Sequence, residues 1–122
     1  MHLPGDKRSI EYDAAARKVI MRFDVAPEFC YFEGREVQRG YSAAWIDAAM
    51  AQLVSRVTSG EHAAATLEMN LNNIQPVVGR LVRAEASIER IGRRVAFLDG
   101  CLLDEESILL IASSRTILLV RS

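Results

Sequence analysis

One acidic residue stands alone inside a stretch of small and apolar residues, where a carboxylate could do chemistry. The stretch VQRGYSAAWIDAAMAQLVSRV spans residues 37–57 and has the composition of a helix. At about 100° per residue, Asp47 falls near the centre of its apolar arc, whereas Ser42, Gln52 and Arg56 fall near the opposite side. Because an unpaired buried carboxylate is costly, we predict that Asp47 either has a polar partner or takes part in a reaction.

Length and composition indicate one ordinary globular domain that covers residues 1–122. Half of the residues are hydrophobic, and 25% are charged, as is typical of a folded domain. The formal net charge is −1, whereas proteins that bind nucleic acid or anionic membranes are normally strongly basic. We therefore expect neither nucleic acid nor a membrane among the partners.

The cysteines and histidines are too few and too scattered for a metal site. Cys30 and Cys101 form no CxxC motif, and His2 and His62 lie far from both. We predict two reduced thiols and no bound metal. The N-terminus is charged where a signal peptide needs an apolar run, and no apolar segment is long enough to span a bilayer. A cytoplasmic location is therefore expected.

The remaining chain has the pattern of an antiparallel sheet. One helix over 41–57 ends before Gly60, a typical C-terminal breaker. Such a helix inserted early among strands joined by short turns predicts an α+β fold, with the helix packed on one face of the sheet. Alternation of apolar and polar residues predicts strands at 17–25, 66–72, 80–91, 95–103 and 108–120, and residues 9–12 can pair with the first of them.

The last predicted strand, 108–120, carries more apolar residues than one buried face requires. Its segments ILLI and ILLV are apolar at successive positions, and therefore on both faces. Two explanations stay open, local variation or a second face covered by another subunit. The second would make the protein a dimer or a tetramer.

Four separate motifs follow one another along the chain: the helix motif around Asp47, the strand ATLEMN, the proline after it and the turn-strand GRRVAF. In order and spacing they resemble the hotdog-fold thioesterases of the PaaI-type (phenylacetate-pathway) group. The resemblance covers roughly residues 18–120. It implies a curved antiparallel sheet of about five to six strands around one long central helix. It also implies a homodimer or homotetramer with active sites at the subunit interface, and acyl-CoA substrates with no cofactor besides this coenzyme A.

The resemblance also implies catalytic roles. Asp47 corresponds to the nucleophile, or the general base that directs water at the thioester carbonyl. The backbone amide of Arg39, which follows Gln38, corresponds to the donor that polarises this carbonyl, as free N–H groups at a helix start can. Thr66 matches a hydroxyl that positions the water or the carboxylate. On residue type alone, Asp47 could instead be a buried carboxylate bonded to backbone, and Thr66 an ordinary strand residue.

Substrate-binding residues are implied at both ends of the site. Gly40 lies at the helix start, and Tyr31 lies in the aromatic loop before it. Gly92, Arg93 and Arg94 correspond to the phosphate end, since arginine matches phosphate oxygens well. Without the resemblance, these two arginines would be read as a solvated turn.

The sequence departs from the family pattern beside the helix. Residues 38–40 read Gln-Arg-Gly where the family often has His-Gly-Gly, and residues 31–33 offer no Asn to place the water. An acyl-CoA thioesterase is the function indicated, and a non-hydrolytic module that binds acyl thioesters or assembles subunits is the alternative. A hotdog dehydratase fits less well, because neither His2 nor His62 is placed for catalysis.

Overall fold

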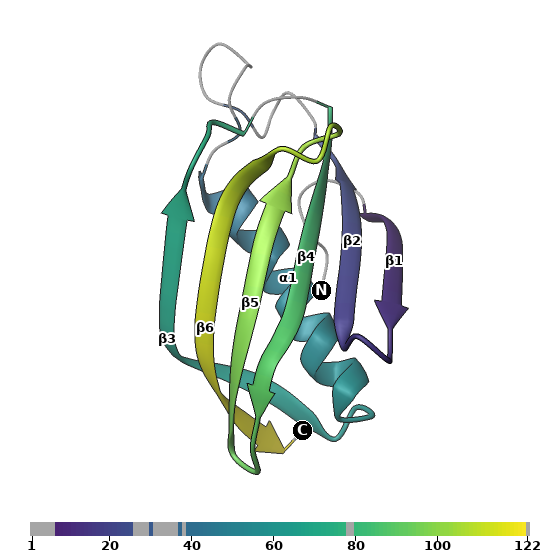
Figure 1. Cartoon of the computed structure of the whole chain (residues 1–122), viewed down its shortest axis with the longest axis vertical. Helices are drawn as coiled ribbons and strands as arrows, with labels where there is room; N and C mark the ends of the chain where they lie inside the picture. Colours follow the sequence, from purple (N-terminus) through teal and green to yellow (C-terminus); the bar gives the residue numbers. More distant parts are fainter. Residues whose placement is uncertain (1–6, 26–29, 31–36, 38, 78–79, 122) are drawn as a thin grey trace.

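The computed structural model describes residues 7–25, 30, 37, 39–77 and 80–121. These form one helix and six strands (Figure 1). Within the described residues, no helix has the length and apolar character needed to cross a membrane. The elements are β1 (Lys7–Asp13), β2 (Lys18–Asp24), α1 (Arg39–Val57), β3 (His62–Asn73), β4 (Leu81–Ile91), β5 (Val95–Leu103) and β6 (Leu109–Arg121).

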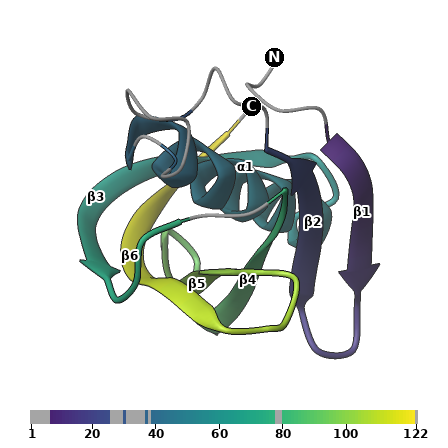
Figure 2. The ribbon, with the colours of Figure 1, turned by 90° about the horizontal axis from the view of Figure 1, so that it is seen from above.

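All six strands belong to one antiparallel sheet with the order β1-β2-β4-β5-β6-β3. The sheet curves around α1, as the view from above shows (Figure 2). The predicted hairpin of the first two strands and the predicted meander of the last three are confirmed. The predicted α+β class, with one long helix against a curved sheet of about five to six strands, is confirmed as well.

The helix α1 begins two residues earlier than predicted and ends where predicted. After Val57 the chain turns through Gly60, which has φ of +77°, a left-handed conformation that glycine adopts without strain. The amide of Gly60 donates to the carbonyl of Ser55 at 2.7 Å, and Thr58 Oγ1 donates to the carbonyl of Val54 at 2.8 Å. Carbonyls at the end of the helix are thereby satisfied.

The core lies between one face of α1 and the concave face of the sheet. Trp45 stacks on Phe23 of β2 with ring centroids 5.6 Å apart, and both rings are fully buried. Gly100 of β5 lets the helix approach closely, since an added Cβ would lie 2.6 Å from Met50 Cε and 3.1 Å from Ile46 Cγ2. The sheet and these large side chains therefore fix where α1 lies and which of its faces is turned outward.

The strand β3 is an edge of the sheet and is longer than predicted. It pairs only with β6, and its register shifts between Thr66 and Glu68. Leu67 is 59% exposed and Met69 is 55% exposed. A long edge strand with exposed apolar side chains is open to pairing with another chain.

The strand β6 is only partly apolar on both faces. Leu110, Ile111 and Ile117 are buried in the core, whereas Leu109 and Val120 are exposed. The excess apolar surface noted in the sequence therefore lies mainly at the two ends of this strand. Whether another subunit covers it stays a prediction.

Candidate active site

Asp47 lies at the border of the buried face of α1, and the prediction that it lies near the centre of this face is wrong. Its side chain is 55% exposed, whereas Ile46, Ala49 and Leu53 are fully buried. The large side chains decide which face is buried, because burial energy grows with apolar area. Of the angular neighbours of Asp47, Met50 and Val54 on one side are buried, whereas Ala51 on the other side is exposed.

The carboxylate of Asp47 has a partner on the sheet. Nη1 of Arg115, in β6, donates to its Oδ1 in an ion pair. The Arg115 side chain is only 6% exposed and lies in an inward-facing row with Ser113 and Ile117. Of the two alternatives predicted for Asp47, a polar partner is thus observed, and a role in a reaction stays a prediction. The one signal in the sequence for this partner was that Arg115 is a lone charged residue in the inward-facing row of β6.

Thr66 and Met69 of β3 lie on the same face of the sheet as Arg115. In the register of β3 and β6, Thr66 faces Ile117 and Met69 faces Arg115. Directly paired residues of antiparallel strands share a face of the sheet, so both belong to the concave face with Arg115. Both are exposed. Thr66 therefore lies on the concave face, opposite the residue two positions after Arg115, and Arg115 reaches from this face to Asp47.

The start of α1 is the second predicted part of the site. Arg39 is the first helical residue, and Gly40 is exposed with nothing within 4 Å of an added Cβ. Gln38 and Tyr31 lie outside the described residues. Nearby, Val37 donates its amide to the carbonyl of Val77 at 2.7 Å. A hollow of about 190 Å³ opens beside this helix start, lined by Val37, Ser42, Asn73, Ile74, Gln75, Pro76 and Val77.

The third predicted part, Gly92, Arg93 and Arg94, forms the exposed turn between β4 and β5. A hollow of about 470 Å³ lies at this turn, lined by these residues together with Arg90, Ile91, Val95 and Phe97. Arg90 was not singled out from the sequence. Its guanidinium lies 4.9 Å from the ring centroid of Phe97, a cation–π contact that adds a third arginine to the two predicted.

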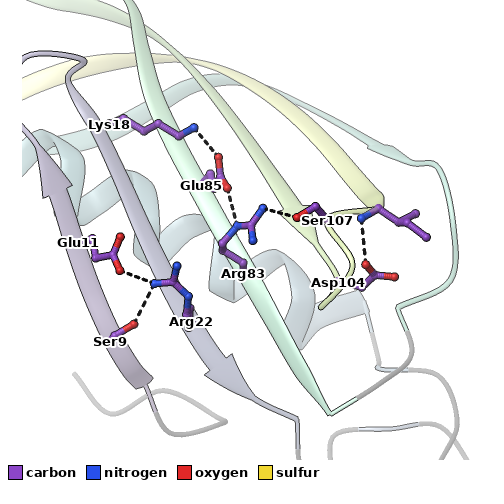
Figure 3. A network of polar contacts seen from close by, with 9 residues as sticks. Ser9, Glu11, Lys18, Arg22, Arg83, Glu85, Asp104 and Ser107 are labelled. Atoms are coloured by element: carbon purple, nitrogen blue, oxygen red, sulfur yellow. Dashed lines mark hydrogen bonds and ion pairs between the residues drawn. The ribbon is translucent and has the colours of Figure 1, made fainter.

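The convex face of the sheet carries a polar network (Figure 3). Glu85 accepts bonds at 2.6 Å from Lys18 and from Arg83, and Arg83 also donates to Ser107. Burial alone would raise the pKa of Glu85, but the hydrogen bonds and charges of Lys18 and Arg83 lower that pKa below its usual 4.5. The network therefore stabilises the sheet on the face opposite Asp47.

The cysteines offer no second reactive centre. Cys30 and Cys101 are both free of disulfide bonding, as predicted. Burial raises the pKa of the Cys101 thiol, which disfavours the reactive thiolate. Among the described residues, no group of three His, Cys, Asp or Glu side chains could hold a metal ion.

Comparisons with known proteins identify the family. The model of the thioesterase superfamily matches residues 39–111, from the first residue of α1 into β6. A phenylacetic acid degradation-related protein of Ralstonia eutropha is 26% identical, with a TM-score of 0.80 over 93% of this chain and 83% of that chain. Comparison with curated proteins gives no match.

Two further solved structures share the fold. A Bacillus halodurans protein solved with CoA is 23% identical, with a TM-score of 0.80 over 93% of this chain and 74% of that chain. A thioesterase of Haemophilus influenzae is 20% identical, with a TM-score of 0.81 over 98% of this chain and 80% of that chain. Because the family match covers more than half of the sequence and the sheet curves around one long helix, the chain belongs to the thioesterase superfamily and has its hotdog fold.

Proposed function

We propose that this protein is an acyl-CoA thioesterase in which Asp47 acts as nucleophile or general base. The observation that carries the proposal is the carboxylate itself, which lies half-exposed on α1 and is bonded to Arg115 of the sheet. A nucleophile or base must be reachable by substrate and fixed in direction. The Bacillus halodurans structure with CoA supports CoA as the leaving group.

The oxyanion donor in this proposal is the amide of Arg39, and it comes from a second copy of the chain. Asp47 follows Arg39 by eight positions in α1, or about 12 Å along the axis. A carboxylate in attacking position and a donor to the same carbonyl oxygen can be at most about 6–7 Å apart. One chain therefore cannot supply both groups to one carbonyl, whereas two symmetry-related chains can.

The free edge of β3 supports such an assembly, as a homodimer or a larger homo-oligomer. Its exposed apolar side chains, Leu67 and Met69, lie on the strand that borders the Asp47 region. A second β3 added at this edge would cover these side chains and satisfy the free backbone groups. It would also bring a second α1 near the first.

The turn between β4 and β5 is the proposed contact for the phosphates of CoA. Arg90, Arg93 and Arg94 line one hollow there, and several guanidinium groups around a hollow suit a polyanionic ligand. Gly92 lies in the same turn, where its amide donates to the carbonyl of Val95 at 2.8 Å. This residue keeps the turn tight between the arginines.

The experiment that tests the function is the hydrolysis of a panel of aryl- and fatty-acyl-CoA thioesters by Asp47→Asn. The substitution keeps the shape of the side chain and removes its basic oxygen, so kcat should fall about a hundredfold or more. The control is Asp99→Asn, at an exposed aspartate on the convex side of β5, which should leave kcat unchanged. Hydrolysis by Asp47→Asn at the wild-type rate would refute the proposal. Binding of acyl-CoA without turnover by the wild type would favour the non-hydrolytic alternative.

The two-chain site has its own test, complementation between two inactive variants. Arg39→Pro removes the proposed donor N–H at the first helical position, where proline is tolerated. Homo-oligomers of Arg39→Pro or of Asp47→Asn should be inactive. After mixing and exchange, dimers that contain one chain of each kind hold one intact site, so about a quarter of the wild-type activity should return. No return of activity after verified exchange would show that the two groups act within one chain.

A further inference from the structure

Arg115 is a buried charge whose counter-ion is exposed. Its side chain is 6% exposed, whereas that of Asp47 is 55% exposed. Arg115 projects from the concave face of β6, in the row of Ser113 and Ile117. The ion pair therefore joins the helix to the sheet at the carboxylate on which the proposed function depends.

Most of the hydrogen-bonding capacity of this guanidinium is unused. Nη1 donates to Asp47, but Nε and Nη2 are buried and have no partner among the described residues. A buried guanidinium with so few partners loses more in desolvation than a single ion pair returns. An apolar side chain of similar length would stabilise this position better. Stability alone therefore does not explain an arginine at residue 115.

The bond to Asp47 points to a functional role for Arg115, which is to orient the Asp47 carboxylate. An aspartate side chain has two torsions, and among the described residues Arg115 is the partner that holds the half-exposed Asp47 carboxylate. The bond from Arg115 engages Oδ1, which leaves Oδ2 to face a substrate. Since β6 lies between β5 and β3 in the sheet, the arginine is anchored to a strand that is paired on both sides.

We propose that Arg115 is the positioning residue of the active site, which fixes the Asp47 carboxylate through Oδ1 and presents Oδ2 as the reacting oxygen. This inference rests on the proposed thioesterase function. It assigns Arg115 no contact with the substrate. Its loss should therefore lower kcat and leave KM for acyl-CoA nearly unchanged.

The test is Arg115→Ala, assayed for acyl-CoA hydrolysis with and without added guanidinium ion. Misplacement of the carboxylate by about 1 Å should lower kcat roughly a hundredfold. Guanidinium chloride at about 50 mM, far below denaturing concentrations, should restore roughly tenfold of this loss by occupying the vacated position. Equal concentrations of sodium chloride or urea should restore nothing. Arg83→Ala is the matched control, because Arg83 is a partly buried, ion-paired arginine on the opposite face of the sheet.

A double-mutant cycle separates failure of this inference from failure of the function. If Arg115 acts through Asp47, then Arg115→Ala should lower kcat no further in an Asp47→Asn chain. Loss of activity in Asp47→Asn but not in folded Arg115→Ala would overturn the positioning role and leave the function intact. A fall in kcat without guanidinium rescue, or an equal fall in both backgrounds, would also overturn it. If Arg115→Ala does not fold, Arg115→Met preserves the apolar stem and carries the same kcat and double-mutant tests.

Discussion

The close approach of α1 to β5 leads to a sharp prediction at Gly100. In Gly100→Ala, the new Cβ would lie 2.6 Å from Met50 Cε, 3.1 Å from Ile46 Cγ2 and 3.5 Å from the backbone oxygen of Glu85. The end of the methionine can rotate away, but Ile46 is β-branched and stiff, so it must move with the helix by a few tenths of an ångström. We expect a loss of about 1–2 kcal/mol in the free energy of unfolding, at the lower end of the range for overpacking.

Thermal unfolding followed by circular dichroism measures this loss, which for a chain of this length corresponds to a fall in Tm of roughly 3–8 °C. In a Met50→Ala background, most of the methionine contact is already gone, so the effect of Gly100→Ala should become clearly smaller. Gly40→Ala is the contrasting variant, because nothing lies within 4 Å of its Cβ and alanine favours a helix. It should raise Tm slightly.

The same substitution should also affect catalysis, because Ile46 precedes Asp47 and Met50 lies one turn further along α1. A small displacement of this turn moves the carboxylate against the anchored Arg115. We expect kcat to fall several-fold at a temperature where the chain is still folded. A Gly100→Ala protein with unchanged Tm would refute the reasoning, since α1 would then not lie at this distance from β5.

Two other predictions test the turn between β4 and β5 and the polar network on the convex face of the sheet. Arg93→Ala with Arg94→Ala should raise KM for acyl-CoA about tenfold, with little effect on an acyl-N-acetylcysteamine thioester, which lacks the nucleotide; equal effects on both substrates would contradict a phosphate contact. For Glu85, the pKa in the folded state is lowered, so the ionised side chain stabilises the fold above its usual pKa of 4.5, and this contribution is lost as pH falls through the folded-state value. Glu85→Gln should therefore unfold more readily than wild type at pH 7, and the gap in Tm should close in acid; a gap that is constant with pH would contradict the ion-pair origin.

The fold was predictable from the sequence because its signals are local. Alternation in KVIMRFD and the short turn at Gly92 fix the strands and their antiparallel pairing. The direction of Asp47 was not predictable in the same way. Hydropathy counts an alanine such as Ala51 as apolar, but the buried face of α1 was decided by the volume of Trp45 and Leu53.

The partner of Asp47 could not be found from local patterns, because Arg115 lies 68 residues away in the sequence. Their contact depends on the order of the strands, which places β6 between β5 and β3 rather than at an edge. It depends also on the phase of β6, which turns Arg115 inward. A slip of one residue would turn this side chain to the convex face. The order of the strands and the phase of β6 depend on contacts between residues far apart in the sequence, so local patterns do not predict them.

The same region of the molecule holds several features that are unfavourable in an isolated chain. Met69 exposes apolar surface, the edge of β3 has free backbone groups, and Arg115 has two buried donors without a described partner. A second copy at the β3 edge would cover Met69 and pair with the backbone groups of β3. The proposed positioning of Asp47 gives a catalytic reason for the buried Arg115. If the assembly forms as proposed, the site is complete only when the surface is covered, so dilution below the dimer dissociation constant should lower activity and stability together. If the protein keeps its activity at concentrations where it is monomeric, a single chain is active, and this result would contradict a site shared between two chains.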